Sequence, residues 1–349
     1  MQLFEWRPIK VKSNSIGPLP DKLSKLVFKG SLVLLLFLSV VGFGSTEWPI
    51  MWQLLPFYVG LFILGMPHGA ADHLLIWGLL GKDSTSFRIV SLLIYISLSG
   101  IYLLAWGIYP IFSALFFLVL TIFHWGQGDR YITAYLHGAH YLDRSRFLSV
   151  LHLILRGSLP IVLPGYLGNE IYHDFFVTMV KQSGKDITAF MPILEGRIVF
   201  LLIPLILFIL YTGITFLSSR QEERKALLTD LVEGFGLFLW FLFIPPLWAI
   251  GIYFVFWHSL RHALRILWID QVGQIALQSF KIVTLSKRWL SLTTIMTILA
   301  LLGLWFTLSL SLTLNGMEID WLGKAMIGIS ILTLPHTVLV CLLDKRQSV

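Results

Sequence analysis

The sequence contains few charged residues and a single cysteine. Asp, Glu, Lys and Arg make up 13% of its 349 residues, roughly half the share that is usual in soluble domains. So few charges cannot cover the surface of a soluble protein of this length, which excludes an ordinary cytosolic protein and a disordered chain. Because Cys341 is the only cysteine, an internal disulfide and a cysteine-ligated zinc or iron–sulfur site are excluded as well.

The sequence is rich in long apolar runs. Hydrophobic residues make up 56% of the chain, and the runs are long enough to cross a bilayer as helices. They predict an all-α integral membrane protein, a polytopic helical bundle of about 8–10 transmembrane helices. We expect spans at residues 31–44, 51–80, 89–108, 111–127, 147–166, 198–217, 231–246, 247–268, 289–313 and 325–343. Pro245 and Pro246 separate two of these spans, because consecutive prolines interrupt helix hydrogen bonding.

The basic residues predict the orientation of the chain. Residues 1–29 form a basic arm, and residues 30–345 form a single transmembrane helical domain. With the arm in the cytoplasm, most Lys and Arg outside the spans fall in inner loops, as the positive-inside rule requires. We therefore expect a multi-pass protein of the cell membrane, whose basic excess requires no nucleic-acid partner. The run at 147–166 contains Arg156 and two prolines, so whether it spans the membrane is left open.

The histidines inside the spans are the candidate functional residues, because ionisable groups are costly in a membrane. His258 and His262 are four residues apart, which places both imidazoles on one face of a helix. His68, His124 and His336 lie on three other spans. In the expected topology these four spans run in the same direction and carry histidine at a similar depth. This convergence favours a metal or cofactor site over separate hydrogen-bonded core histidines.

Other polar residues near these histidines are candidate supporting groups. Asp72 lies four residues after His68 and shares its helix face, so its carboxylate can orient a ligand imidazole. A buried pair between Asp72 and Arg261, or between Asp72 and another buried cation, is the competing expectation. His73 lies about 140° around the helix from His68, so the two rings are not expected to face the same point.

The histidine ligands limit the metals that such a site could bind. Imidazole-rich sites without thiolates suit Zn, Cu, Fe or Ni. Four neutral histidines leave two positions open on an octahedral ion, which fits Fe(II) that must bind O2 in an apolar cavity. Zinc would instead form a closed tetrahedron or keep one open position for hydrolysis. The sequence has no nucleophile elbow, Walker A pattern or dinucleotide fingerprint.

Four motifs occur in an order that resembles a known family. They are GMPHGAADH (65–73), FHWG (123–126), WHSLRH (257–262) and LPHTVL (334–339). Together they resemble the bacterial Brp/Blh family of integral-membrane β-carotene 15,15′-dioxygenases, over roughly residues 50–343. The family's four proposed iron ligands correspond to His68, His124, His258 and His262. The family's PH pair corresponds to Pro335 and His336, whose role is left open.

The resemblance implies an Fe(II) cofactor and a specific reaction. O2 would cleave the central double bond of β-carotene, supply both aldehyde oxygens and release two molecules of all-trans-retinal. The substrate would enter laterally from the lipid bilayer, and a retinal-binding opsin would be a downstream partner. These are expectations from the family and do not follow from composition or spacing.

Three other functions remain open. A di-iron desaturase or carotenoid hydroxylase would contain repeated HxxxH and HxxHH clusters, whereas one HxxxH occurs here. A haem protein would use pairs of histidines from facing helices. A transporter or proton channel would use histidines and Asp72 as a proton relay.

Overall fold

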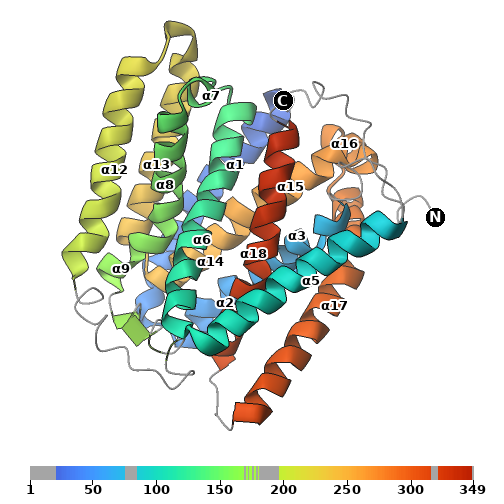
Figure 1. Ribbon diagram of the computed structural model, residues 1–349. Helices are drawn as coiled ribbons and strands as arrows, with labels where there is room; N and C mark the ends of the chain where they lie inside the picture. The colour runs from blue at the N-terminus through green and yellow to red at the C-terminus, as the bar shows by residue number, and fades with distance from the viewer. Residues whose placement is uncertain are drawn as a thin grey trace.

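The computed structural model describes residues 21–74, 85–168, 196–315 and 321–347, together with isolated positions between 169 and 195. Every regular element in these ranges is helical. Most of the basic arm, residues 1–20, lies outside the described residues. The described helices form a bundle that contains both long helices and helices broken into shorter segments (Figure 1).

The long helices are α1 (Asp21–Gly42), α5 (Thr85–Ile108), α6 (Pro110–Tyr131), α8 (Arg146–Val162), α12 (Arg197–Ser218), α13 (Arg224–Phe243), α17 (Ile282–Asn315) and α18 (Trp321–Gln347). The shorter α-helices are α2 (Ile50–Gly60), α3 (Met66–Ala70), α7 (Tyr141–Arg144), α9 (Pro164–Leu167), α14 (Pro246–Ile252), α15 (Leu260–Ile269) and α16 (Gln271–Gln278). The described residues also form three π-helical segments, η2 (Leu61–Gly65), η3 (Ile132–Leu136) and η6 (Tyr253–Ser259), and two 3-10 turns, η1 (Ser45–Glu47) and η5 (Gln221–Glu223).

The expected polytopic helical architecture is confirmed. Eight segments of the described chain are long and apolar enough to cross a membrane. They are Ile50–Leu74, Thr85–Ile108, Pro110–Ala134, Arg146–Leu167, Arg197–Ser218, Gln221–Phe243, Ile282–Phe306 and Ala325–Lys345. The protein is therefore a multi-pass membrane protein, since helices satisfy their own backbone hydrogen bonds in lipid.

Three of the ten expected spans require comment. The first is short, because the apolar part of α1 covers only Gly30–Gly42. The run at 247–268 is divided into α14, η6 and α15, so no single long helix corresponds to it. The run at 147–166, left open from the sequence, lies within a segment that is long and apolar enough to cross. The break at Pro245 and Pro246 is confirmed, since α13 ends at Phe243 and α14 begins at Pro246.

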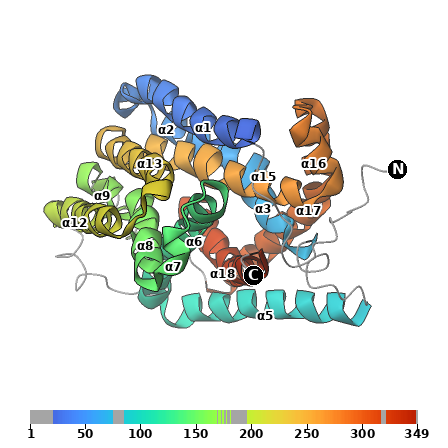
Figure 2. The same ribbon diagram turned by 90° about the horizontal axis from the view of Figure 1, so that it is seen from above.

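The helices surround a core that holds the histidine-bearing elements. Viewed from above, α5 runs along one edge and α1 along the opposite edge, with α12 on a third side and α16 and α17 on the fourth (Figure 2). Between these edges lie α3, α6, α15 and α18. This arrangement places the histidine motifs, which are far apart in the sequence, inside one bundle.

Two glycines allow α6 to lie directly against α8. A Cβ atom added to Gly126 would lie 1.9 Å from the carbonyl oxygen of Leu153, and one added to Gly157 would lie 1.8 Å from that of Ile122. Neither position tolerates a side chain, because the two backbones are in contact there. Such close approach is how small residues stabilise helix pairs in membranes, and here it holds α6 in the position that directs His124 inward.

Candidate metal centre

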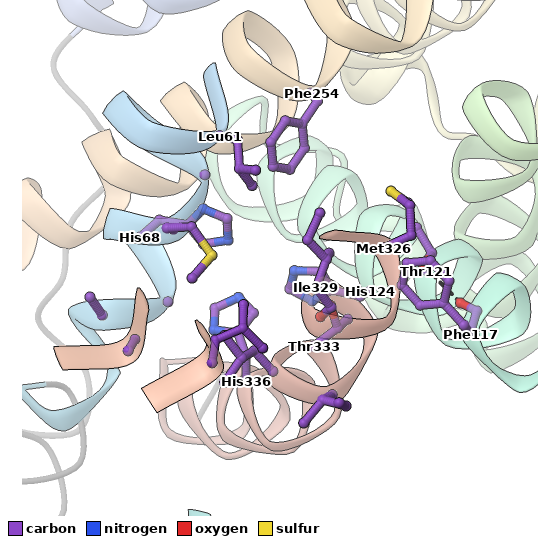
Figure 3. A pocket seen from close by; sticks show the side chains of 18 of the residues that line it. Leu61, His68, Phe117, Thr121, His124, Phe254, Met326, Ile329, Thr333 and His336 are labelled. Atoms are coloured by element: carbon purple, nitrogen blue, oxygen red, sulfur yellow. Dashed lines mark hydrogen bonds between the residues drawn. The ribbon is translucent and has the colours of Figure 1, made fainter. Parts of the chain in front are cut away.

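Five histidines from four parts of the chain meet inside the bundle. His68 comes from α3, His124 from α6, and His336 from α18. His258 is the sixth residue of η6, and His262 follows in α15. All five are buried, with at most 6% of each residue exposed. Figure 3 shows the imidazoles of His68, His124 and His336 directed toward one another.

The ring separations show that the five imidazoles form one cluster. The centroid of the His336 ring lies 4.8 Å from that of His68 and 4.7 Å from that of His124. The His258 ring lies 4.9 Å from that of His124, and the His262 ring 5.2 Å from that of His68. We name these five residues the imidazole cluster. The structure therefore brings together the five histidines that the sequence analysis places at a similar depth.

Several nitrogens of the imidazole cluster are buried without a hydrogen-bond partner. They are both ring nitrogens of His124 and Nε2 of His258, His262 and His336. Buried polar atoms are nearly always paired, so a group of convergent unpaired nitrogens requires an explanation. Neutral imidazole nitrogens are good metal ligands. One ligand atom from each of His68, His124 and His336 lies within 4.8 Å of the other two, so these three can hold one metal ion.

Hydrogen bonds set the tautomers of two cluster members. Nδ1–H of His68 donates to the carbonyl oxygen of Leu64 at 3.1 Å. Nδ1–H of His336 donates to the carboxylate of Asp72, at 2.8 and 2.9 Å. In each ring this leaves the Nε2 lone pair available to a metal. The Asp72 carboxylate also accepts a hydrogen bond from the hydroxyl of Tyr95 at 3.3 Å.

Irregular helix geometry occurs beside the histidines. The π-helical segment η2 immediately precedes the α3 motif, and η6 contains His258. π-Helical turns in proteins occur frequently at functional sites. A Cβ atom added to Gly65 would lie 2.6 Å from the Phe254 ring, so glycine is required for η2 to approach η6. This contact brings His68 and His258 together, with ring centroids 5.5 Å apart.

The structure shows which partners the candidate supporting residues have. The imidazole that Asp72 binds is that of His336 and not that of its helix neighbour His68. Arg261 does not pair with Asp72, because it lies on the face of its helix that points toward Glu233, at 3.2 Å, and Asp129, at 3.8 Å. His73 hydrogen-bonds the carbonyl oxygen of Ala70 at 2.6 Å, consistent with its expected exclusion from the ligand set.

A group of buried ionisable residues behind His258 was not anticipated. We name it the charge cluster; it comprises Asp129, Arg156, Asp230, Glu233 and Arg261. Arg156 donates to Asp230 at 2.7 Å, and Arg261 donates to Glu233. The only sequence signal for it was the presence of acidic residues and arginines inside apolar runs.

The charge cluster anchors the helix that carries His258 and His262. The indole N–H of Trp257 donates to both carboxylate oxygens of Asp129, at 2.9 and 3.1 Å. The guanidinium of Arg261 lies 3.5 Å from the centroid of the Trp257 ring, a cation–π contact. Both anchored residues directly precede a cluster histidine, so they restrict rotation of this helix.

The charge cluster also affects a histidine at the end of η3, beyond the membrane-spanning part of α6. Burial, followed by the positive charge of Arg261, lowers the pKa of His137 to about 3. The ring Nε2 lies 3.9 Å from Glu233. His137 is therefore neutral at physiological pH.

The imidazole cluster forms part of the wall of a large apolar cavity. The cavity has a volume of about 770 Å³ and includes His68, His124, His258 and His336 in its lining. Figure 3 shows Leu61, Phe254, Phe117 and Met326 lining it near these rings. The volume lies within the range of about 300–1,000 Å³ found for small-molecule sites, so the cavity can hold a sizeable apolar ligand.

The cavity reaches the lipid-facing surface between α5 and α17. Leu92 and Ile96 of α5 and Leu299 of α17 all line it, although 55%, 57% and 56% of these residues, respectively, are exposed. Side chains that are both cavity lining and surface mark an opening. Since the exposed faces of α5 and α17 are apolar, the opening faces the membrane interior.

Comparisons with known proteins identify the family to which the chain is similar. The profile of the family described as β-carotene 15,15′-dioxygenase matches residues 59–344. A probable β-carotene 15,15′-dioxygenase Blh from Halobacterium salinarum (strain ATCC 700922 / JCM 11081 / NRC-1) is 30% identical over 314 residues, which are 84% of this chain and 85% of the relative. A β-carotene 15,15′-dioxygenase from the uncultured marine bacterium 66A03 is 26% identical over 290 residues, 82% of this chain and 92% of the relative.

No solved structure matches the chain significantly. The family profile covers all four histidine motifs, from the α3 segment to α18. It also covers the two π-helical segments beside the imidazole cluster and the cavity-lining helices α5, α6 and α17. The chain belongs to the β-carotene 15,15′-dioxygenase family.

Proposed function

We propose that this protein cleaves β-carotene at its central 15,15′ double bond with O2 and releases two molecules of all-trans-retinal. The observation that carries the proposal is a set of unpartnered, buried imidazole nitrogens at the wall of an apolar cavity. Such a site would hold a redox metal on the imidazole nitrogens and a hydrocarbon substrate in the apolar cavity beside it. Family membership and the names of the relatives support the same reaction.

We assign His68, His124, His258 and His262 as ligands of an Fe(II) ion. The observations that support a metal are the unpartnered ring nitrogens of His124, His258 and His262 and the short distances between the four rings, and imidazole without thiolate suits iron. Bound Fe(II) supplies the activation of O2. The protein's own part is to hold neutral imidazoles in fixed tautomers, as the Leu64 carbonyl does for His68.

The cavity residues position the polyene and exclude water. The rings of Trp125 and Phe254 lie against His258, with centroids 5.5 and 6.3 Å from the imidazole. Their flat apolar faces leave a polyene beside the imidazole cluster little freedom to move. Fixing the reacting bond beside the metal site lowers the entropic barrier, and the apolar wall keeps water from the reacting carbons.

We propose that the substrate enters from the bilayer through the opening between α5 and α17. β-Carotene is a hydrocarbon that partitions into lipid, so an opening lined by Leu92, Ile96 and Leu299 meets it where it is most concentrated. We further propose that the protein resides in the cell membrane with a cytoplasmic N-terminus, as its basic loops favour. The retinal produced is a ligand for an opsin, which would be the downstream partner.

Expression in a bacterial host that accumulates β-carotene tests the activity. The wild type should bleach the cells and produce retinal, measured by chromatography of lipid extracts. His258→Ala should leave β-carotene intact, because it removes one imidazole from the cluster. His140→Ala is the matched control, since His140 is an exposed histidine that takes no part in the cluster; it should behave as the wild type.

Other outcomes would redirect the assignment. A well-expressed, iron-loaded wild type that leaves β-carotene unchanged would contradict this substrate. An intense Soret band in the purified protein would indicate haem. Proton uptake or currents without bound iron would favour a relay, for which the buried pair of Asp72 and His336 is the relevant feature.

A further inference from the structure

His336 occupies a central place in the imidazole cluster, although the family motif assigns the metal to four other histidines. Its ring contacts those of three cluster members, with centroids 4.8 Å from His68, 4.7 Å from His124 and 5.5 Å from His262. The group of three histidines able to hold one ion contains His336 and neither His258 nor His262. A ligand set that omits His336 would leave an imidazole in contact with three metal ligands and without a function.

The hydrogen bonds of His336 prepare it as a ligand. Its Nδ1–H donates to Asp72, while its Nε2 is buried and has no hydrogen-bond partner. A metal-bound histidine usually donates its other N–H to a carboxylate or carbonyl, and this partner raises the basicity of the ligand. Asp72 is itself held by the hydroxyl of Tyr95. His336 therefore has the partner arrangement of a metal ligand.

The charge of a bound metal ion gives a second reason for the contact between Asp72 and His336. Neutral imidazoles leave the charge of a divalent cation uncompensated, and in a low-dielectric interior this is costly. Asp72 is only 2% exposed, and its carboxylate touches the imidazole cluster through His336. Of the carboxylates in the charge cluster, Asp129 and Glu233 lie beside Trp257 and Arg261, behind the histidines. Asp72 is therefore placed to offset part of the metal's charge through His336.

We propose that His336 is an additional metal ligand, and that Asp72 is the positioning residue that orients it, with Tyr95 holding the carboxylate. This inference rests on the proposed function, because it concerns the same metal. Five imidazoles would leave one position of an octahedral ion for O2. The proposed ligand set differs from that of the family motif because it includes His336. Asp72 acts on the metal through His336.

Metal binding by the purified, detergent-solubilised protein tests the inference without reference to activity. Apoprotein would be titrated anaerobically with Fe(II), and metal per chain measured after desalting; Co(II) would report coordination through its visible absorption. His336→Ala should weaken Fe(II) binding at least tenfold and change the Co(II) spectrum, and added imidazole should restore part of both. Asp72→Asn should weaken binding by about 10–100-fold. His73→Ala, from the same segment but outside the cluster, should bind metal as the wild type does.

The outcomes separate the inference from the proposed function. If the wild type binds iron and makes retinal, but His336→Ala retains wild-type affinity and Co(II) spectrum, His336 is not a ligand and the proposed function stands. If the wild type itself binds no iron, the proposed function fails instead. Should His336→Ala not fold, His336→Gln and Asp72→Asn decide the question, and wild-type metal binding in both would overturn the inference.

Discussion

The buried ion pair between Asp270 and Arg288 offers a quantitative test of how the helix that carries His262 is held in place. Both side chains are completely buried. Arg288 donates from Nε and from a terminal nitrogen to the two carboxylate oxygens, each at 2.8 Å. Asp270 also caps α16 by accepting a hydrogen bond from the backbone N–H of Gly273 at 2.9 Å. The pair thus joins the end of α15, which carries His262, to α17.

Arg288→Met should be strongly destabilising, because it leaves a buried carboxylate without its counter-ion. Two hydrogen bonds between charged groups contribute about 1.5–3 kcal/mol each, and breaking a buried pair costs about 3–5 kcal/mol. At roughly 2 °C per kcal/mol for a chain of this size, the melting temperature should fall by about 6–10 °C. Lys287→Met, which removes an exposed cation from the same helix, should change it by less than about 1 °C.

The double variant Asp270→Ser/Arg288→Met separates loss of the pair from loss of a counter-ion. Serine keeps a cap for Gly273 but carries no charge, so more than half of the lost stability should return. Thermal unfolding in detergent, followed by tryptophan fluorescence and by the fraction that remains monodisperse, measures all four proteins. A double variant that melts as low as Arg288→Met would refute the reasoning.

Three further results are expected. Gly303→Trp, at a cavity-lining position of α17, should slow β-carotene turnover several-fold at unchanged metal content. The control Gly213→Trp, at an open position of α12 outside the cavity lining, should not slow it. Equal turnover by the two variants would contradict the proposed opening. Because the pKa of His137 is lowered to about 3 from 6.5, the unfolded chain binds more protons between these values, so acidification below pH 6.5 destabilises the fold. His137→Gln should therefore reduce this loss, by up to about 1.4 kcal/mol per pH unit, in unfolding measured from pH 7 to pH 4.5, and an unchanged pH slope would count against it. Chelation of the metal should lower the melting temperature, since saturation at 100 times the dissociation constant stabilises by about 2.7 kcal/mol; a chelator effect of the same size on His258→Ala would place that metal elsewhere.

The helical architecture and the convergence of the histidines could be predicted from the sequence. Long apolar runs form helices in lipid, because no water is present there to hydrogen-bond the backbone N–H and C=O groups. Histidines within such runs are costly, so their common depth indicated a shared site before any contact was known. The i, i+4 relation of His258 and His262 likewise follows from helix geometry alone.

Partners across the bundle could not be predicted in this way. Asp72 shares a helix face with His68, yet its carboxylate binds His336, which is 264 residues away. The rotation of each helix about its axis depends on how side chains of different helices pack, and helical periodicity does not contain that information. The break of 247–268 into α14, η6 and α15 was missed for a related reason, because a π-helical turn depends on its neighbours more than on local composition.

A polytopic helical membrane protein with histidines gathered at one depth therefore follows from the pattern of residues along the chain. The packing of the helices sets the remaining features: His336 lies among these histidines with Asp72 behind it, Arg261 belongs to the charge cluster, and the cavity opens between α5 and α17. The physical reason is that lipid imposes helix formation on each segment separately. Buried polar groups, in contrast, find their hydrogen-bond and ion-pair partners on other segments. These partners are set only when all the segments pack together.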